Sequence, residues 1–250
     1  MTAKPQIFEA ASGHKIAYHQ TEGQGPGVVF LGGFMSDMTG SKATHLEAWA
    51  KARGQAYLRF DYSGHGQSSE AFTDGCIGDW YDDALSLMEE VTRGPQILVG
   101  SSMGGWISLL IARSDHIPTA ALFGIAAAPD FTQEGIWPSL DAQDRVTLAR
   151  DGVVYVPSDY GDPYPITKKL IEDGRDHLIF PKPLKLDCPV RLFQGTEDTS
   201  VSTQTATRLL DHVEAEDARL MLVRGADHSF SDAVCLDILT KELDVILDTL

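Results

Sequence analysis

Short apolar runs and amphipathic segments alternate along most of the chain. Six runs have the composition of strands that are covered on both faces, and they lie at residues 28–31, 57–60, 97–99, 121–125, 190–193 and 220–223. Between these runs, apolar residues recur with helical spacing at Trp80, Ala84, Leu87, Met88 and Val91, at Ala206, Leu209, Leu210 and Val213, and at Ile238, Leu239 and Ile246. This alternation predicts an α/β fold, in which a mostly parallel, twisted sheet carries helices on both faces.

Two segments depart from this rhythm. Residues 6–20 alternate in polarity around Ser12-Gly13, which predicts a short hairpin. Residues 130–187 are rich in aromatic residues and proline, among them Trp137, and hold only short helical patterns. We expect this second segment to be a lid or cap inserted into the sheet domain, where it would supply apolar walls to a site and control the entry of water.

Length and composition are those of a globular protein with a substantial core. A chain of 250 residues with 43% hydrophobic residues can form a single α/β domain, which we place at residues 1–250. The formal net charge of -16 opposes binding to nucleic acid and to anionic membrane surfaces.

Cysteine usage and the absence of long apolar runs suggest a compartment. Cys76, Cys188 and Cys235 are too few and too scattered for a disulfide framework or a metal site. No run approaches the length of a membrane span, and Met1 and its successors lack the apolar core of a signal peptide. We therefore expect a cytoplasmic protein without stable membrane insertion, as a monomer or a homodimer.

The strongest chemical signal is Gly100-Ser101-Ser102-Met103-Gly104, which joins the apolar run at 97–99 to a helix-like segment. Gly-x-Ser-x-Gly between a strand and a helix is the context of a nucleophile elbow. The glycines are needed because the central serine is held in a strained conformation, and a β-carbon two residues away would collide with the turn. Ser102 is the predicted nucleophile.

A serine nucleophile needs a base, and the base needs an orienting carboxylate. Asp198 follows the run at 190–193, and His228 follows the run at 220–223. Both therefore lie past the carboxyl ends of predicted strands, the edge at which open α/β sheets bind ligands. We predict that Asp198 orients His228 and that His228 takes the proton of Ser102.

Other residues could fill these roles. Asp130 also follows a predicted strand and is the main rival for the carboxylate, while Glu197 and Asp227 are neighbours of the chosen residues. His65 follows the strand at 57–60 but precedes the nucleophile, which favours a structural or pocket-lining role. No histidine has the spacing of a metal ligand, so we expect no metal and no cofactor.

The oxygen anion of a tetrahedral intermediate needs two donors. The N–H of Met103, at a helix N-terminus, is one candidate, and the N–H of Phe34, after Gly32-Gly33, is the other. We expect Gly33, Ser101 and Trp137 to contact the substrate.

These motifs together make the chain resemble the α/β-hydrolase superfamily over nearly its full length. The resemblance is carried by Gly32-Gly33-Phe34, by Asp61-Tyr62-Ser63-Gly64-His65-Gly66, by the serine motif, and by the segments around Asp198 and His228. Residues 34–43, 59–64 and 94–106 look most like the abhydrolase-domain proteins described as palmitoyl-protein thioesterases and acyl-glucuronide deacylases.

The resemblance implies hydrolysis of S-acyl thioesters or activated esters through Ser102, His228 and Asp198, with Phe34 and Met103 at the oxyanion site. The substrate would be a small-molecule acyl ester or thioester, or an S-acylated protein. A general carboxylesterase acting on short-chain or glucuronide esters is the alternative within the same chemistry. Two alternatives do not involve ester hydrolysis: carbon–carbon bond hydrolysis or perhydrolysis on the same scaffold, and a hydrolase-like binding protein without activity.

Overall fold

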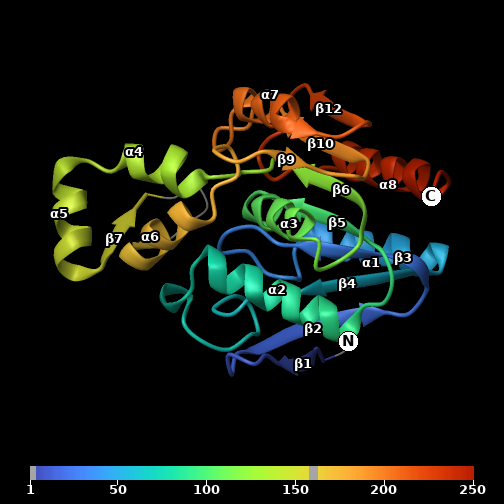
Figure 1. Ribbon diagram of the computed structural model, residues 1–250, viewed down its shortest axis with the longest axis horizontal. Helices are drawn as coiled ribbons and strands as arrows, with labels where there is room; N and C mark the ends of the chain where they lie inside the picture. The colour runs from blue at the N-terminus through green and yellow to red at the C-terminus, as the bar shows by residue number, and fades with distance from the viewer. Residues whose placement is uncertain (1–3, 158–162) are drawn as a thin grey trace.

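One large sheet organises the molecule. The computed structural model describes residues 4–157 and 163–250, and within them eight strands form a sheet in the order β1-β2-β4-β3-β5-β6-β10-β12 (Figure 1). The strands are β1 (Gln6–Glu9), β2 (Lys15–Thr21), β3 (Gln24–Leu31), β4 (Gln55–Phe60), β5 (Gln96–Ser101), β6 (Thr119–Ile125), β10 (Val190–Gly195) and β12 (Ala218–Val223). Pairs involving β2 are antiparallel and the other pairs are parallel, so the predicted mostly parallel sheet is confirmed.

Helices cover both faces of this sheet, as the amphipathic stripes predict. The main helices are α1 (Ser41–Arg53), α2 (Ile77–Val91), α3 (Met103–Ser114), α7 (Thr203–His212) and α8 (Ala233–Leu247). On one face α2 and α3 pack against the sheet, and on the other α1 contacts α8 (Figure 1). In α2, Trp80, Ala84, Leu87 and Met88 are fully buried. Burial of each large apolar side chain contributes roughly 1.5–3 kcal/mol to folding, which fixes this helix on the sheet.

The first hairpin forms where it is predicted. β1 and β2 pair with Gln6 opposite Tyr18, and the turn between them includes Gly13 at φ +89°. A left-handed conformation of this kind favours glycine, which has no β-carbon to clash.

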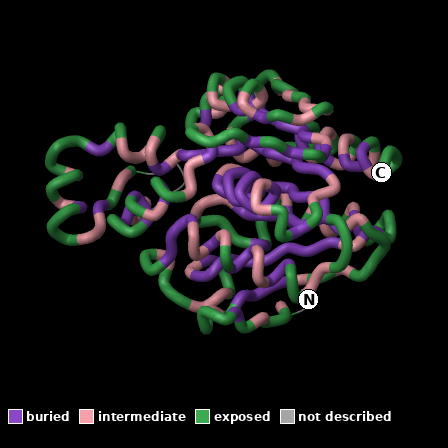
Figure 2. The backbone as a smooth tube through the Cα atoms, in the orientation of Figure 1, coloured by how far each residue is buried: buried purple, intermediate pink, exposed green. Residues whose placement is uncertain are grey.

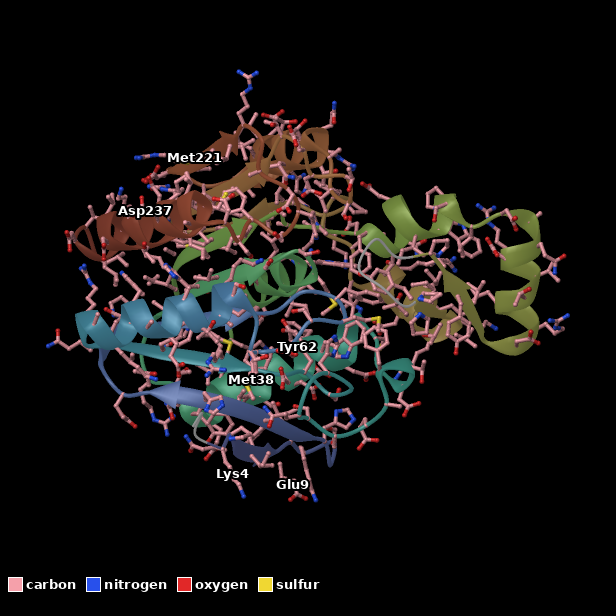
Figure 3. All side chains as sticks on the ribbon, turned by 180° about the vertical axis from the view of Figure 1, so that it is seen from behind. Lys4, Glu9, Met38, Tyr62, Met221 and Asp237 are labelled. Carbon is pink, nitrogen blue, oxygen red and sulfur yellow. The ribbon has the colours of Figure 1, made fainter. Side chains whose placement is uncertain are left out.

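Two local predictions need correction. The run at 220–223 is not buried on both faces: β12 is the edge strand, and its consecutive residues Met221 and Leu222 are 37% and 48% exposed. Figure 3 labels Met221 on this strand. The helical stripe that was expected to reach Val213 stops at His212, and Val213–Glu214 instead form β11, which pairs with β9 (Leu184–Lys185). An apolar run therefore identifies a strand but not its place in the sheet.

The chain between β6 and β10 leaves the sheet and extends to one side of it (Figure 1), where most of its backbone is exposed or half-buried (Figure 2). It holds short elements, η2 (Thr132–Ile136), α4 (Trp137–Ser139), α5 (Ala142–Asp151), β7 (Val153–Val156), β8 (Tyr164–Thr167) and α6 (Lys168–Asp176). Residues 158–162 of the predicted insertion and residues 1–3 at the start of the sequence lie outside the described residues.

Helix α6 ties this insertion to the sheet domain. Asp173 Oδ2 accepts a hydrogen bond of 2.8 Å from the Gly78 N–H, and Lys169 Nζ lies 2.5 Å from Asp79 Oδ2, both at the start of α2. A short turn, η1 (Phe72–Asp74), lies just before this point, and the Asp74 carbonyl also accepts from Lys169. Across the described residues, no helix has both the length and the apolarity to cross a bilayer.

Candidate active site

Ser102 occupies a strained turn between β5 and α3. Its backbone has φ 54° and ψ -117°, a left-handed conformation that a residue with a β-carbon adopts only when its surroundings enforce it. The surroundings do so through hydrogen bonds of 2.9 Å from the Ser102 N–H to the Ile125 carbonyl and 3.1 Å from the Ala128 N–H to the Ser102 carbonyl. The side chain is thereby presented at the carboxyl edge of the sheet.

The flanking glycines make this turn possible. A β-carbon on Gly100 would overlap the Gly104 carbonyl and the Ser108 hydroxyl, and one on Gly104 would overlap the Leu31 carbonyl at the end of β3. The motif therefore requires glycine on each side of Ser102 for the steric reason that its spacing predicts.

A chain of hydrogen bonds runs from Ser102 to Asp198. His228 Nε2 lies 3.1 Å from Ser102 Oγ, and His228 Nδ1 lies 2.8 Å from Asp198 Oδ2. A carboxylate only accepts, so Nδ1 carries the proton that it donates to Asp198. In the neutral ring Nε2 is then unprotonated and faces the serine hydroxyl, the tautomer that a general base needs.

The Asp198 side chain is fully buried and is held by four donors. Besides His228, the Gln194 amide donates to Oδ2 at 2.8 Å, and the N–H groups of Ser200 and Val201 donate to Oδ1 at 2.8 Å each. Burial alone would raise the pKa of Asp198, but the hydrogen bonds from His228, Val201 and Gln194 outweigh it and hold the pKa below its usual value. The carboxylate is therefore charged at neutral pH.

The two predicted oxyanion donors belong to segments that lie next to Ser102. The loop after β3 passes so close that a β-carbon on Gly33 would lie 3.4 Å from the Ser102 β-carbon, and Met103 begins α3 directly after the serine. Among the described residues, neither the Phe34 N–H nor the Met103 N–H donates a hydrogen bond to another group. Both N–H groups therefore remain candidates for the oxyanion site, which needs two free donors.

A cavity of about 500 Å³ opens over Ser102. Gly33, Phe34, Ser101 and His228 lie in its wall, and the insertion contributes an apolar side made by Phe131, Ile136, Val156, Tyr164 and Ile166. The Phe34 ring packs edge-on against Phe131 and Tyr164, with centroids 5.6 and 5.5 Å apart. The insertion thus shapes the space in front of the serine.

Trp137 does not line this cavity, contrary to the prediction that it contacts the substrate. Its ring lies beneath the guanidinium groups of Arg145 and Arg175, at 4.8 and 5.2 Å from the ring centre. These cation–π contacts hold Trp137 within the insertion. Its neighbour Ile136 reaches the cavity in its place.

The rival residues have structural partners. The Asp130 carboxylate accepts hydrogen bonds from the Ile179 and Phe180 N–H groups, at 2.7 and 3.0 Å, and so ties together the two ends of the insertion. His65 is buried against the rings of Phe72 and Trp80. No group of three or more metal-ligating side chains occurs within residues 4–157 and 163–250.

His65 predicts a pH dependence of stability. Its Nδ1 donates to the Ser63 carbonyl at 3.1 Å, and burial lowers the pKa of His65 to about 4, against 6.5 for an exposed histidine. Between these values the unfolded chain binds more protons than the folded one, so stability falls as pH falls. When the pH is lowered from 7.5 to 5.5, the free energy of unfolding of the wild type should fall by about 1 kcal/mol more than that of His65→Phe. Urea denaturation of both proteins at the two pH values measures the difference. Equal losses in both proteins would contradict this reading.

Sequence reasoning missed Gln194, Phe131, Tyr164 and Lys42, which all lie at or beside the site. Gln194 lies in β10 and donates to Asp198 four residues later, and Lys42 lies in the segment at 34–43 that carries the resemblance, but no residue pattern assigned a role to either of them. The one available signal was the aromatic content of the insertion, which indicates apolar walls but not which rings supply them.

Known proteins resemble this chain in sequence and in structure. The profile of the Alpha/beta hydrolase family matches residues 28–234. The chain is 34% identical over 239 residues to palmitoyl-protein thioesterase ABHD10, mitochondrial, of Bos taurus, covering 94% of this chain and 77% of that protein. A putative hydrolase from Agrobacterium vitis S4 superposes with a TM-score of 0.91 at 35% identity, over 98% of both chains. The alpha/beta hydrolase domain-containing protein 10 from mouse superposes with a TM-score of 0.90 at 31% identity, over 99% of both.

Proposed function

The chain belongs to the α/β hydrolase family, and from this premise we propose that it is a serine hydrolase that cleaves carboxylic thioesters or esters. The single observation that carries the proposal is the hydrogen-bonded series from Ser102 through His228 to Asp198, at 3.1 and 2.8 Å. A serine hydroxyl, an imidazole and a buried carboxylate in this order form a triad, in which the carboxylate orients the imidazole and the imidazole activates the serine as a nucleophile.

In the proposed reaction, Ser102 Oγ attacks the acyl carbonyl carbon while His228 Nε2 takes the hydroxyl proton. The carbonyl oxygen becomes an anion, which the Phe34 and Met103 N–H groups stabilise. The intermediate then expels the leaving thiol or alcohol, which receives the proton from His228. Water attacks the acyl-enzyme with His228 again as base, and the free acid leaves with Ser102 restored.

The insertion at 130–187 acts as a lid in this proposal. Its apolar side chains in the cavity suit the acyl chain of a substrate, and they exclude water from the region around Ser102. Asp130 ties its two ends together, and α6 anchors it to the sheet domain.

Among substrates, S-acyl thioesters are the leading class, because relatives about a third identical over 94% of this chain are called palmitoyl-protein thioesterases. The acyl group would come from a small-molecule thioester or from an S-acylated protein. A general carboxylesterase is the second candidate, since the same groups attack oxygen esters. A binding protein without activity is disfavoured by the imidazole bonded to the Ser102 hydroxyl and by the Phe34 and Met103 N–H groups, which donate to no other group among the described residues.

A substrate panel tests this function. Purified protein should incorporate a fluorophosphonate probe at Ser102 and should hydrolyse acyl thioesters faster than oxygen esters of the same acyl chain, measured as kcat/KM for chains of increasing length. Faster turnover of the oxygen esters would favour the carboxylesterase. A labelled serine with an inactive panel would point to chemistry other than ester cleavage, and folded protein that stays unlabelled would contradict the proposal.

A reducing compartment fits the same proposal. Cys76, Cys188 and Cys235 are all free and buried, which is usual where thiols stay reduced. We place the enzyme in the cytoplasm on this ground, as a monomer or homodimer, whereas the bovine and human relatives are described as mitochondrial. Fractionation of cells that produce the native protein distinguishes the two locations.

A further inference from the structure

The cavity over Ser102 has a second, polar side that the proposed reaction does not use. This side contrasts with the apolar side that the insertion supplies. It is made by the loop before α1, the first turn of α1 and the loop after His228. Its polar side chains are Ser36, Asp37, Ser41, Lys42, Ser229 and Ser231. A substrate that fills the whole cavity would therefore have an apolar part and a polar part.

Lys42 is fixed at this polar side. Its ammonium group donates to the Ser229 carbonyl, one residue after His228, and lies 3.3 Å from Ser231 Oγ. An ammonium has three donors, and within residues 4–157 and 163–250 these two contacts account for only two of them. One donor and the positive charge remain for a ligand.

No carboxylate neutralises this charge. Across the described part of the chain, Lys42 forms no ion pair within 4.0 Å. Asp37 shares the cavity, but its Oδ1 accepts from the Thr39 N–H and hydroxyl, at 2.7 and 2.5 Å. Burial lowers the pKa of Lys42 to about 8, and the negative charge of Asp227 offsets this only in part.

The position is unfavourable for a cation in a second way. Lys42 lies in the first turn of α1, where the helix dipole is positive, and that turn contains no acidic residue. An incompletely compensated cation in a protein of net charge -16 is stabilised best by an anion that enters the cavity.

The neighbouring histidine indicates which part of the substrate this anion belongs to. In the proposed reaction His228 protonates the leaving group, so the leaving group must lie on the His228 side of Ser102. Lys42 contacts the residue that follows His228, whereas the apolar side chains of the insertion suit the acyl chain.

We propose that Lys42 is a specificity-determining residue that binds an anionic group, a carboxylate or a phosphate, on the leaving group of the substrate. This inference rests on the proposed hydrolase function and adds the charge of the leaving group to it. One charge-assisted hydrogen bond in a partly buried site corresponds to a preference of about tenfold or more.

Two pairs of octanoyl thioesters test this inference. In the first pair the leaving thiol is 3-mercaptopropionate or its uncharged amide, and in the second it is 2-mercaptoethyl phosphate or 2-mercaptoethanol. The readout is the ratio of kcat/KM for the charged and uncharged members of each pair. We expect the wild type to favour the charged member of at least one pair by about tenfold or more, and the pair concerned identifies the anion as carboxylate or phosphate.

Four variants assign the preference to Lys42. Lys42→Met and Lys42→Gln should bring the ratio close to 1, and Lys42→Arg should keep most of it. Glutamine can still donate to Ser229, so it separates the charge from the tether to the His228 loop. Lys51→Met is the matched control, because it removes an exposed lysine from the same helix and should leave the ratio unchanged.

The outcomes separate the two proposals. A wild-type ratio near 1 in both pairs, with all thioesters hydrolysed, overturns the role of Lys42 and leaves the hydrolase function standing. A preference that survives in Lys42→Gln overturns it as well, even if Lys42→Met fails to fold. No hydrolysis of any thioester, with Ser102 unlabelled by the fluorophosphonate probe, overturns the hydrolase function itself.

Discussion

Replacement of Ser102 by alanine is expected to reduce kcat for thioester hydrolysis by about a millionfold, the size of loss seen when the nucleophile of a serine triad is removed. The physical reason is that His228 Nε2, 3.1 Å from Ser102 Oγ, then has no hydroxyl to deprotonate. Covalent labelling by a fluorophosphonate should disappear with the turnover. Burst-phase and steady-state kinetics on the best substrate of the panel measure the loss.

The fold should survive this change, because alanine keeps the β-carbon and so leaves the backbone at φ 54° as it was. The thermal unfolding midpoint should therefore stay close to that of the wild type. Ser114→Ala, at the other end of α3, is the matched control and should retain full activity, since its hydroxyl donates only to the Ile111 carbonyl. Turnover that persists in Ser102→Ala would remove Ser102 from the mechanism.

Asp198→Asn is expected to lower kcat by about three to four orders of magnitude, by analogy with other serine triads. Both carboxylate oxygens of Asp198 accept hydrogen bonds, Oδ2 from His228 and Gln194, and Oδ1 from the Ser200 and Val201 N–H groups. An asparagine side chain has one acceptor oxygen and one NH2 group, so in either orientation the NH2 group must face hydrogen-bond donors. When it faces His228, Nδ1 has to accept, and the proton moves to Nε2, where it blocks the base.

The neighbouring residue provides the control for Asp198→Asn. Glu197→Gln removes one negative charge at an exposed position next to Asp198, and kcat should change by no more than about twofold because exposed charges are screened. A comparable fall in both variants would mean that charge near the site matters and that orientation of His228 does not. Full activity of Asp198→Asn would return the role to Asp130.

The elements of the fold could be predicted because they depend on local periodicity. The stripe from Trp80 to Met88 became the buried face of α2, and the runs at 28–31 and 97–99 became adjacent parallel strands. The order of the sheet did not follow from these patterns. β4 lies between β2 and β3, and β12 lies at the edge with Leu222 exposed, because neighbours in a sheet are chosen by crossover connections and packing.

Some residues of the site could also be predicted from the sequence, and others could not. Ser102, Asp198 and His228 were predictable because each follows a strand, and parallel strands bring their carboxyl ends to one edge. Trp137 was assigned to the cavity from its place in the insertion, yet two arginines hold it elsewhere. Lys42 lies in the segment at 34–43, whose residue pattern assigns it no role, and only the fold brings its ammonium group to the Ser229 carbonyl, 187 positions away in the chain.

The amino-acid sequence by itself determined the α/β class, the strained serine turn and the three polar residues in their order, because these depend on residue type and on spacing over a few positions. Only the tertiary structure decided the sheet order, the apolar and cationic sides of the cavity, and the contact between Lys42 and the loop after His228. These features depend on contacts between distant segments, and such contacts form only when packing brings the segments together.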